Sequence, residues 1–301
     1  MLLDYINTYR FWTCIFVTIV GMELVSGGFL MVYNCKVFLY ANNKQQIRFY
    51  SNDIHVNDSI TELIEEKRSY TKSVKKENGI ETNRDFSAMV SQKRTINEIY
   101  NITRSNSWDY FITLTFNPQR VNRYDFDDVV EAAGKYFNFL RKEYDKDLKY
   151  FLVPEKHQDG AWHIHGLVAS NMITIVNSGH VDKKGRTIYH MPHYIYGFSD
   201  ATRISNQFAA CSYMTKYVTK DLCFDTMYRN RYIVSKNVGR AEEKEIRISA
   251  DRLKKIVSGF DNILFTKTVQ NGDEFVYYIE TENQEKVFEF LDNNMDFEDV
   301  E

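Results

Sequence analysis

The stretch Lys149 to Ser170, KYFLVPEKHQDGAWHIHGLVAS, consists of two strand-like runs around a polar turn, and the second run carries two histidines one residue apart. Side chains i and i+2 of a β-strand point to the same face, and their Cα atoms lie about 6.5 Å apart. His163 and His165 can therefore share one cation while Ile164 packs on the other side. Taken alone, the motif is equally typical of two half-buried sheet histidines. The rest of the chain favours the metal site.

Glu155, in the first run, is the third ligand that we expect. The hairpin between the two runs decides whether this side chain reaches the histidines. A two-residue turn at Asp159 and Gly160 would turn Glu155 away from them. A three-residue loop with a glycine bulge would bring Glu155 opposite His165, and we expect this second register.

Charge is distributed unevenly along the chain. The 301 residues are 44% hydrophobic and 15% aromatic, which provides ample apolar material for a buried core. Residues 261–301 contain 12 acidic and 2 basic residues, net -10, so residues 1–260, with 36 basic and 29 acidic residues, carry net +7. A basic body is typical of a protein that binds nucleic acid, whereas the tail is acidic.

Cysteine usage and hydropathy indicate the compartment. The four cysteines form neither a CxxC pair nor a dense framework, which argues against a structural zinc site and a disulfide scaffold: Cys14, Cys35, Cys211 and Cys223. The most apolar N-terminal run, Phe11 to Met22, is too short to span a bilayer. We expect a cytoplasmic protein with no membrane partner.

The first 30 residues have a separate interpretation. Residues 26–31, SGGFLM, can be encoded by a purine-rich ribosome-binding sequence followed by a start codon. We therefore expect residues 1–30 to be an untranslated or disordered extension. The domains expected after it are residues 31–85, an N-terminal hairpin and helix; residues 86–250, the domain with the histidines; and residues 251–301, a C-terminal hairpin that turns at Asn271-Gly272 and an acidic tail.

The elements of the middle domain predict its fold. In chain order they are a helix from about Phe86 to Arg104, a strand from Asp109 to Phe116, a helix from its Asp125 cap to about Tyr144, the hairpin, a strand-like segment near Arg186 to Tyr189, and a helix from Ser199 or Asp200 to about Leu222. This order is typical of a split βαβ unit. We expect an α+β fold with a central antiparallel sheet, similar to ferredoxins and RNA-recognition motifs, with helices on one face and the histidines on the open face.

A second cluster of reactive side chains lies in the last of these helices, in the sequence YMTKYVTK from Tyr213 to Lys220. Residues four apart on a helix share a face, so Tyr213 and Tyr217 can approach the same point. Lys216 and Lys220 repeat that spacing on an adjacent face. Two core tyrosines with exposed lysines would give the same pattern, but its combination with the two-histidine strand favours a catalytic site.

These motifs resemble those of the HUH replication initiators of rolling-circle plasmids and single-stranded-DNA phages. The sequence TLTF at residues 113–116 stands at the family's first motif, HIH at residues 163–165 at its metal motif, and residues 213–220 at its catalytic tyrosine motif. All three occur in the family's order. The similarity runs from about Phe86 to Arg247 and does not account for residues 1–80 or the acidic tail.

The resemblance implies a metal-dependent, site-specific endonuclease and strand transferase that nicks single-stranded DNA at a replication origin and forms a 5′-phosphotyrosyl intermediate. It assigns catalysis to Tyr217, Tyr213, Lys220 and Lys216, and metal binding to His163, His165 and Glu155. A tyrosine hydroxyl is a weak nucleophile at neutral pH, so a cation must polarise the phosphate. Mg²⁺ or Mn²⁺ can serve, and Mn²⁺ should bind more tightly because it tolerates imidazole better.

The resemblance also implies the partners and leaves alternatives. The expected partners are single-stranded origin DNA and a helicase of the bacterial host, whereas ATP is not needed, in keeping with a sequence that lacks a GxxxxGK[ST] phosphate loop. The alternatives are an HUH transposase or relaxase and a catalytically silent nucleic-acid-binding protein. Relaxases usually supply three histidines, and only Glu155 or the less well placed His157 can fill the third position here. This favours the initiator.

Overall fold

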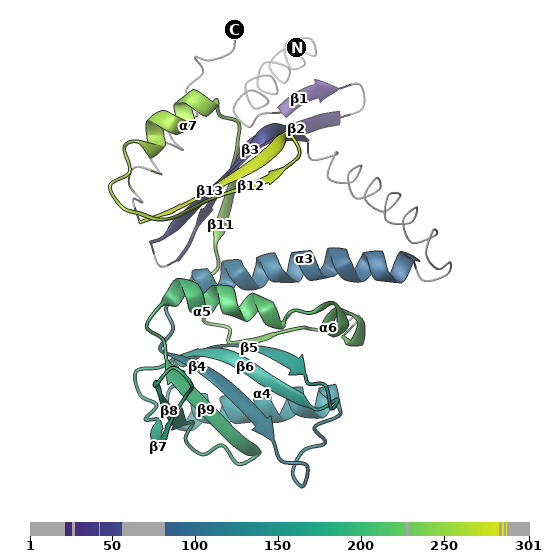
Figure 1. Cartoon of the computed structure of the whole chain (residues 1–301), viewed down its shortest axis with the longest axis vertical. Coiled ribbons are helices and arrows are strands. Elements are labelled where there is room, and N and C mark those ends of the chain that lie inside the picture. The colour runs from purple at the N-terminus through teal and green to yellow at the C-terminus, as the bar shows by residue number, and fades with distance from the viewer. Residues whose placement is uncertain are drawn as a thin grey trace, which may run out of the picture. The chain divides into compact units, whose positions relative to one another are not determined.

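The computed structural model describes residues 22–25, 28–41, 43–55, 82–226, 229–282, 285 and 287. The chain divides into two units, the first formed by Met1–Ile80 with Ala241–Glu301 and the second by Glu81–Arg240 (Figure 1). Each unit contains an antiparallel sheet and helices, so the α+β class is confirmed. Within the described ranges, no helix combines the length and apolar character needed to cross a bilayer.

The second unit is built on a seven-stranded sheet with the order β10-β5-β6-β4-β9-β8-β7. Its strands are β4 (Tyr110–Phe116), β5 (Lys149–Lys156), β6 (Trp162–Ala169), β7 (Val176–Val181), β8 (Thr187–His190), β9 (Gly197–Arg203) and β10 (Ile233–Val234). β6 pairs antiparallel with both β4 and β5, so these two strands run parallel with β6 between them. Helix α4 (Phe126–Glu143) connects them, which is the split βαβ unit that the sequence predicts.

Helix α4 covers one face of this sheet. Its N-cap is Asp125, whose side chain accepts hydrogen bonds from the backbone N–H groups of the next turn, and its C-cap is Tyr144, as the sequence predicts. The buried stripe of α4 consists of apolar and aromatic residues at helical spacing: Phe126, Val129, Ala132, Ala133, Tyr136, Phe137 and Leu140. The ring of Phe137 lies 4.4 Å from that of Tyr150 on β5, between centroids.

The opposite face of the sheet is also covered, so helices lie on both faces rather than on one as the sequence suggests. Figure 1 shows α4 and α5 (Gln207–Met214) on opposite sides of β4, β5 and β6. Phe111 of β4 points away from α4, and its ring centroid lies 5.6 Å from that of Tyr213, at the end of α5. Helix α3 (Thr82–Arg104) holds the segment after α5, because the Gln92 side chain donates a 2.7 Å hydrogen bond to the Val218 carbonyl.

The helix that the sequence places at Ser199 or Asp200 is wrong at both ends. Residues 197–203 form strand β9, which pairs with β4 over its whole length. Serine and aspartate are good caps, but without β9 the N–H and C=O groups along this side of β4 would lack a strand partner. Helix α5 instead has Asn206 as its N-cap and ends at Met214, followed by a 3₁₀ turn, Thr215–Tyr217, and by α6 (Lys220–Asp225).

The first unit joins segments from both parts of the chain. Its six strands are β1 (Met22–Val25), β2 (Gly28–Leu39), β3 (Gln45–His55), β11 (Glu242–Ile246), β12 (Ile263–Asn271) and β13 (Glu274–Thr281), with helix α7 (Ala250–Val257). β3 pairs with β13, so the N-terminal and C-terminal hairpins, which the sequence analysis assigns to separate domains, share one sheet. β1 and the start of β2 lie within the expected extension, whereas residues 1–21 and the acidic tail beyond residue 287 lie outside the described residues.

The C-terminal hairpin turns one residue later than the sequence predicts. Asn271 pairs with Glu274, so the loop consists of Gly272 and Asp273 rather than Asn271 and Gly272. Gly272 has a φ of 62°, a backbone conformation that glycine adopts without steric cost.

Gly166, directly after His165, permits the close approach of strands at the centre of the second unit's sheet. A Cβ atom at this position would clash with Leu152 Cδ2 and lie 2.9 Å from the carbonyl oxygen of Phe151. Any larger residue would therefore force β5 and β6 to adjust beside the histidines.

The substitution Gly166→Ala should lower the free energy of unfolding by about 1–3 kcal/mol, the usual cost of overpacking a core. Gly134→Ala is the matched control, because a Cβ there meets nothing within 4 Å. This change in α4 should raise stability by about 0.5–1 kcal/mol, since alanine has the higher helix propensity. Urea unfolding of the full chain measures both effects, and unchanged stability of Gly166→Ala would contradict the close packing.

Candidate active site

Three neighbouring strands place a set of polar side chains on the face that α5 covers. The pairing of β4 with β6 sets Thr113 opposite His165 and Thr115 opposite His163, and the pairing of β5 with β6 sets Glu155 opposite His163. Directly opposed residues point to the same face of a sheet. All five side chains therefore project toward the segment that carries the two tyrosines.

The register of the β5–β6 hairpin differs from the expected one by a single step of the loop. The loop has three residues, Gln158 to Gly160, and Gly160 has a φ of 85°, as expected for a glycine bulge. It begins one residue earlier than predicted, because the backbone N–H of His157 donates to the carbonyl of Ala161 at 2.9 Å. Glu155 therefore lies opposite His163 rather than His165. The shift is two residues along β6, so Glu155 still faces the histidines.

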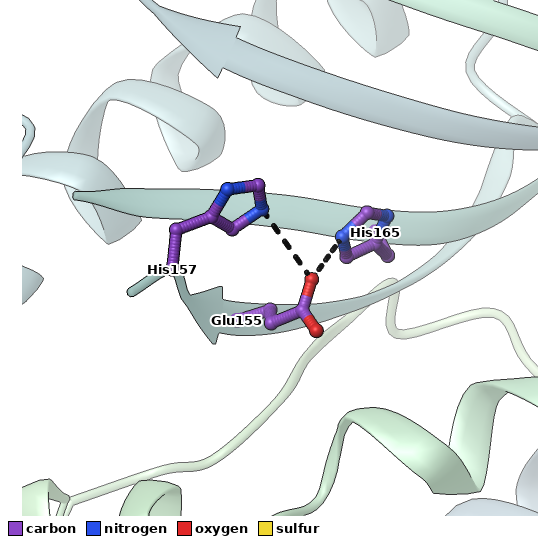
Figure 2. Close-up of side chains that lie close together, drawn as sticks. All are labelled: Glu155, His157 and His165. Atoms are coloured by element: carbon purple, nitrogen blue, oxygen red, sulfur yellow. Dashed lines mark hydrogen bonds and ion pairs between the residues drawn. The ribbon is translucent and has the colours of Figure 1, made fainter. Parts of the chain in front are cut away.

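Glu155, His157 and His165 form a cluster that could hold a metal ion. Figure 2 shows both imidazoles directed at one carboxylate oxygen: Glu155 Oε2 lies 2.7 Å from His165 Nε2 and 3.6 Å from His157 Nε2. The three ligand atoms lie within 4.8 Å of one another. The sequence analysis prefers Glu155 to His157 as the third ligand, whereas the structure brings both of them to His165.

His163 lies beside this cluster. Its ring stacks on that of His157, with centroids 3.8 Å apart and planes at 8°. The structure thus gathers all three ligands named from the sequence, His163, His165 and Glu155, together with a fourth residue. His157 lies just past the end of β5, where a strand pattern gives no side-chain direction, so the sequence offers only its nearness to Glu155 as a signal.

Two threonines orient the histidines of β6. Thr113 Oγ1 lies 3.1 Å from His165 Nδ1, and Thr115 Oγ1 lies 3.3 Å from His163 Nδ1. A partner at Nδ1 fixes the ring and leaves Nε2 for a cation, as is usual around metal-binding histidines. The sequence analysis recognises these threonines only as part of a motif. Their signal is the shared spacing of TxT and HxH on two strands that pair.

The electrostatics of the site favour the forms of the side chains that bind metal. The hydrogen bond from His165 lowers the pKa of Glu155 although partial burial opposes it, and His157 and His163 add to the lowering. Burial lowers the pKa of His163 to about 4, and the two neighbouring histidines act in the same direction. At neutral pH Glu155 is therefore an anion and His163 is neutral.

The two tyrosines lie against this cluster. The ring of Tyr217 stacks on that of His165, with centroids 4.0 Å apart and planes at 8°. Tyr213 meets Tyr217 edge to face at 5.4 Å. Tyr217 is only 7% exposed and Tyr213 is 44% exposed. Burial, together with the hydrogen bond to Tyr213, raises the pKa of Tyr217 well above its usual range.

The lysines of this segment are placed less closely than the tyrosines. Tyr213 and Tyr217 belong to α5 and to the 3₁₀ turn rather than to one continuous helix, yet their rings still meet. Lys216 is exposed, and its Nζ lies 4.8 Å from the centroid of the Tyr213 ring. Lys220 is the first residue of α6, and its side chain lies outside the described residues.

Comparison with known proteins gives one match. Residues 109–222 match the model of a family described as replication-associated protein ORF2. No curated protein and no solved structure matches the chain. The matched residues run from the start of β4 into α6, so they include the histidine hairpin and both tyrosines. The similarity supports an initiator of DNA replication.

The lowered pKa of His163 predicts how stability depends on pH. The unfolded chain takes up a proton on this histidine near its ordinary pKa of 6.5, whereas the folded protein does so only near pH 4. The unfolded state binds more protons between these values, so stability should fall as the pH is lowered from 6.5 to 4. In metal-free protein, His163→Gln should flatten this dependence in urea unfolding, and His180→Gln, in the exposed strand β7, should not. Equal slopes for His163→Gln and the wild type would contradict the assignment.

The role of Thr113 can be tested by its effect on Mn²⁺ binding. Thr113→Val keeps the shape of the side chain but removes the partner of His165 Nδ1, so Mn²⁺ affinity should fall by about 10–100-fold. Thr202→Val, on the same face of neighbouring β9, is the control and should bind Mn²⁺ normally. Isothermal titration of the full chain measures both. Wild-type affinity in Thr113→Val would show that the hydroxyl does not orient the ligand.

Proposed function

We propose that this chain initiates rolling-circle replication as a metal-dependent, site-specific single-strand DNA endonuclease and strand transferase. The observation that carries the proposal is the stack of Tyr217 on His165, within a cluster of metal-binding side chains. A nucleophile and a ligand from distant parts of the chain are thereby brought into ring contact. Origin DNA as the substrate and a host helicase as a partner belong to the same proposal.

The side chains present fit a divalent cation. Two imidazoles and a carboxylate have their donor atoms within 4.8 Å of one another, and Glu155 is held in its anionic form. Glu155 and His165 would hold the ion, with His157 or His163 completing the set. A mixed nitrogen and oxygen set suits Mn²⁺ better than Mg²⁺. When bound, such an ion polarises a phosphate oxygen and offsets the charge that develops on it.

Tyr217 would make the first attack. Its phenolic oxygen forms a bond to the scissile phosphorus while the bond to the 3′ oxygen of the preceding nucleotide breaks. The tyrosine proton leaves to solvent, and the released 3′ oxygen takes up a proton. The product carries a 5′-phosphotyrosyl bond, which conserves the energy of the phosphodiester for later joining.

The surroundings of Tyr217 control when it reacts. Burial and the hydrogen bond to Tyr213 keep its hydroxyl protonated in the protein alone, so its ionisation depends on positive charge brought to the site. The rings of His165 and Phe111 lie nearly parallel to that of Tyr217 and restrict its orientation. A fixed nucleophile reduces the entropy lost on reaching the reactive geometry.

Tyr213 would take part in the second transfer. Its ring lies 5.4 Å from that of Tyr217, and it is the more exposed of the two, so it can receive a strand after Tyr217 is esterified. Lys216 lies against the Tyr213 ring and would stabilise charge on the phosphate or the phenolate, with Lys220 in the same role.

One observation favours a relaxase as the second candidate. His157, His163 and His165 lie together, so the site can supply the three histidines that relaxases usually have. The count of histidines therefore does not separate the two functions. The family match concerns replication-associated proteins and favours the initiator. Nicking of supercoiled DNA that carries the protein's own replicon, rather than a transfer origin, would decide between them.

The tyrosine roles predict different defects in single variants. With Mn²⁺ and the supercoiled replicon, Tyr217→Phe should lose at least about 100-fold of the initial nicking rate, because the nucleophilic oxygen is gone. Tyr213→Phe should still nick but fail in joining, and the double variant should form no covalent adduct. One denaturing gel reads nicking and attachment of the protein to DNA.

The control for these variants is Tyr124→Phe, which removes the hydroxyl of a tyrosine that is 55% exposed and outside the ring cluster. It should nick and join like the wild type. Full nicking by Tyr217→Phe would reverse the order of the two tyrosines. Adduct formation by the double variant would refute the proposed nucleophiles, and absence of any adduct with the wild type would favour a catalytically silent DNA-binding protein.

A further inference from the structure

Phe198 is the most exposed large hydrophobic side chain in the described part of the chain, at 75%. It lies within β9 rather than in a loop, so its exposure follows from the fixed geometry of a strand. No other aromatic ring among the described residues stacks on it. An isolated exposed phenylalanine on a sheet is unfavourable in water unless something covers it.

The position of Phe198 relates it to the candidate active site. It pairs with Thr115 of β4, which in turn pairs with His163 of β6. Phe198 therefore projects from the same face as the histidines, two strands away, at a distance of about 10 Å along the sheet from the spacing of neighbouring strands. A DNA strand with its phosphate at the histidines would reach this ring within a few nucleotides.

The backbone under Phe198 is held tightly. A Cβ atom on the preceding residue, Gly197, would clash with the carbonyl oxygen of Thr115 and lie 2.9 Å from the backbone nitrogen of Asn117. That nitrogen donates a 2.8 Å hydrogen bond to the carbonyl of Tyr196. Glycine thus lets β9 lie close against β4, and the exposed ring sits on a rigid strand.

We propose that Phe198 is a stacking platform for a base of the single strand that is cut at Tyr217. This inference deepens the proposed function and rests on it for the identity of the strand. Aromatic side chains on an open sheet commonly stack bases of single-stranded nucleic acids, and such stacking tolerates any base.

The neighbours of Phe198 favour a base over a protein partner. Its cross-strand neighbour Thr115 is polar, and the next residue of β9 on the same face, Asp200, is an exposed carboxylate. Phe198 is thus a single ring among polar groups, whereas a protein interface requires a larger apolar centre. Asp200 would repel a phosphate, which leaves the base as the part of a nucleotide that fits here.

The test is binding of fluorescent single strands to the full chain without added metal, measured by anisotropy. The probes are an oligothymidine of about 12 nucleotides, within the site sizes of single-strand-binding folds, and an abasic strand of the same length. Phe198→Ala should weaken oligothymidine binding by about tenfold or more and leave abasic binding within about twofold. Phe198→Trp should bind oligothymidine at least as well as the wild type. Because the phosphate contacts are unchanged, the salt dependence should be unchanged too.

Phe139→Ala is the matched control, since Phe139 is 40% exposed and lies on α4, across the sheet from Phe198. It should retain the preference for oligothymidine over the abasic strand. Wild-type oligothymidine binding by Phe198→Ala would overturn the proposal and leave the ring to a protein partner. Equal losses on both probes would also overturn it, because they would indicate a structural role. A missing tyrosyl adduct would instead count against the proposed function, whatever the binding result.

Discussion

The pairing of β6 with β4 on one side and β5 on the other is the constraint on which the site depends. One register places Thr113, Thr115, His163, His165 and Glu155 on a single face, and a slip of one residue in either strand would turn part of the set into the opposite core. Gly166 allows this close pairing, because no side chain separates the strands beside the histidines. The same residues thus define both the centre of the fold and its chemistry.

The second requirement is a helix that stops beside the sheet. Helix α5 ends at Met214, and the 3₁₀ turn that follows sets the Tyr217 ring on His165. Gln92 of α3 satisfies the Val218 carbonyl, which the broken helix would otherwise leave without a partner. Ring contacts with Phe111 and His165 then hold a protonated tyrosine next to a carboxylate and three imidazoles. This arrangement is electrostatically poised for a cation and for a negatively charged substrate.

Local patterns in the sequence predict much of this architecture. The cap and apolar stripe of α4, the alternation of β4 and the glycine loop of the hairpin are all set by residues close in the chain. The helix expected at Ser199 is wrong because its cap residues serve equally well in a strand, and the partner strand β4 decides the outcome. The union of β3 with β13 pairs distant segments, which no local pattern reveals. The place of Glu155 opposite His163 depends on which residue begins a three-residue loop, and His157 enters the cluster from just before that loop.

The central claim is that the hairpin and the tyrosine segment form one metal-dependent site. The most direct test is anomalous diffraction at the manganese edge from crystals of the full chain soaked in Mn²⁺. The account predicts one strong peak bounded by His165 Nε2 and the Glu155 carboxylate, with His157 or His163 as a further ligand, on the side of the sheet that Tyr217 occupies. A peak at another cluster, or no peak in crystals of a protein that still forms the tyrosyl-DNA adduct, would contradict it.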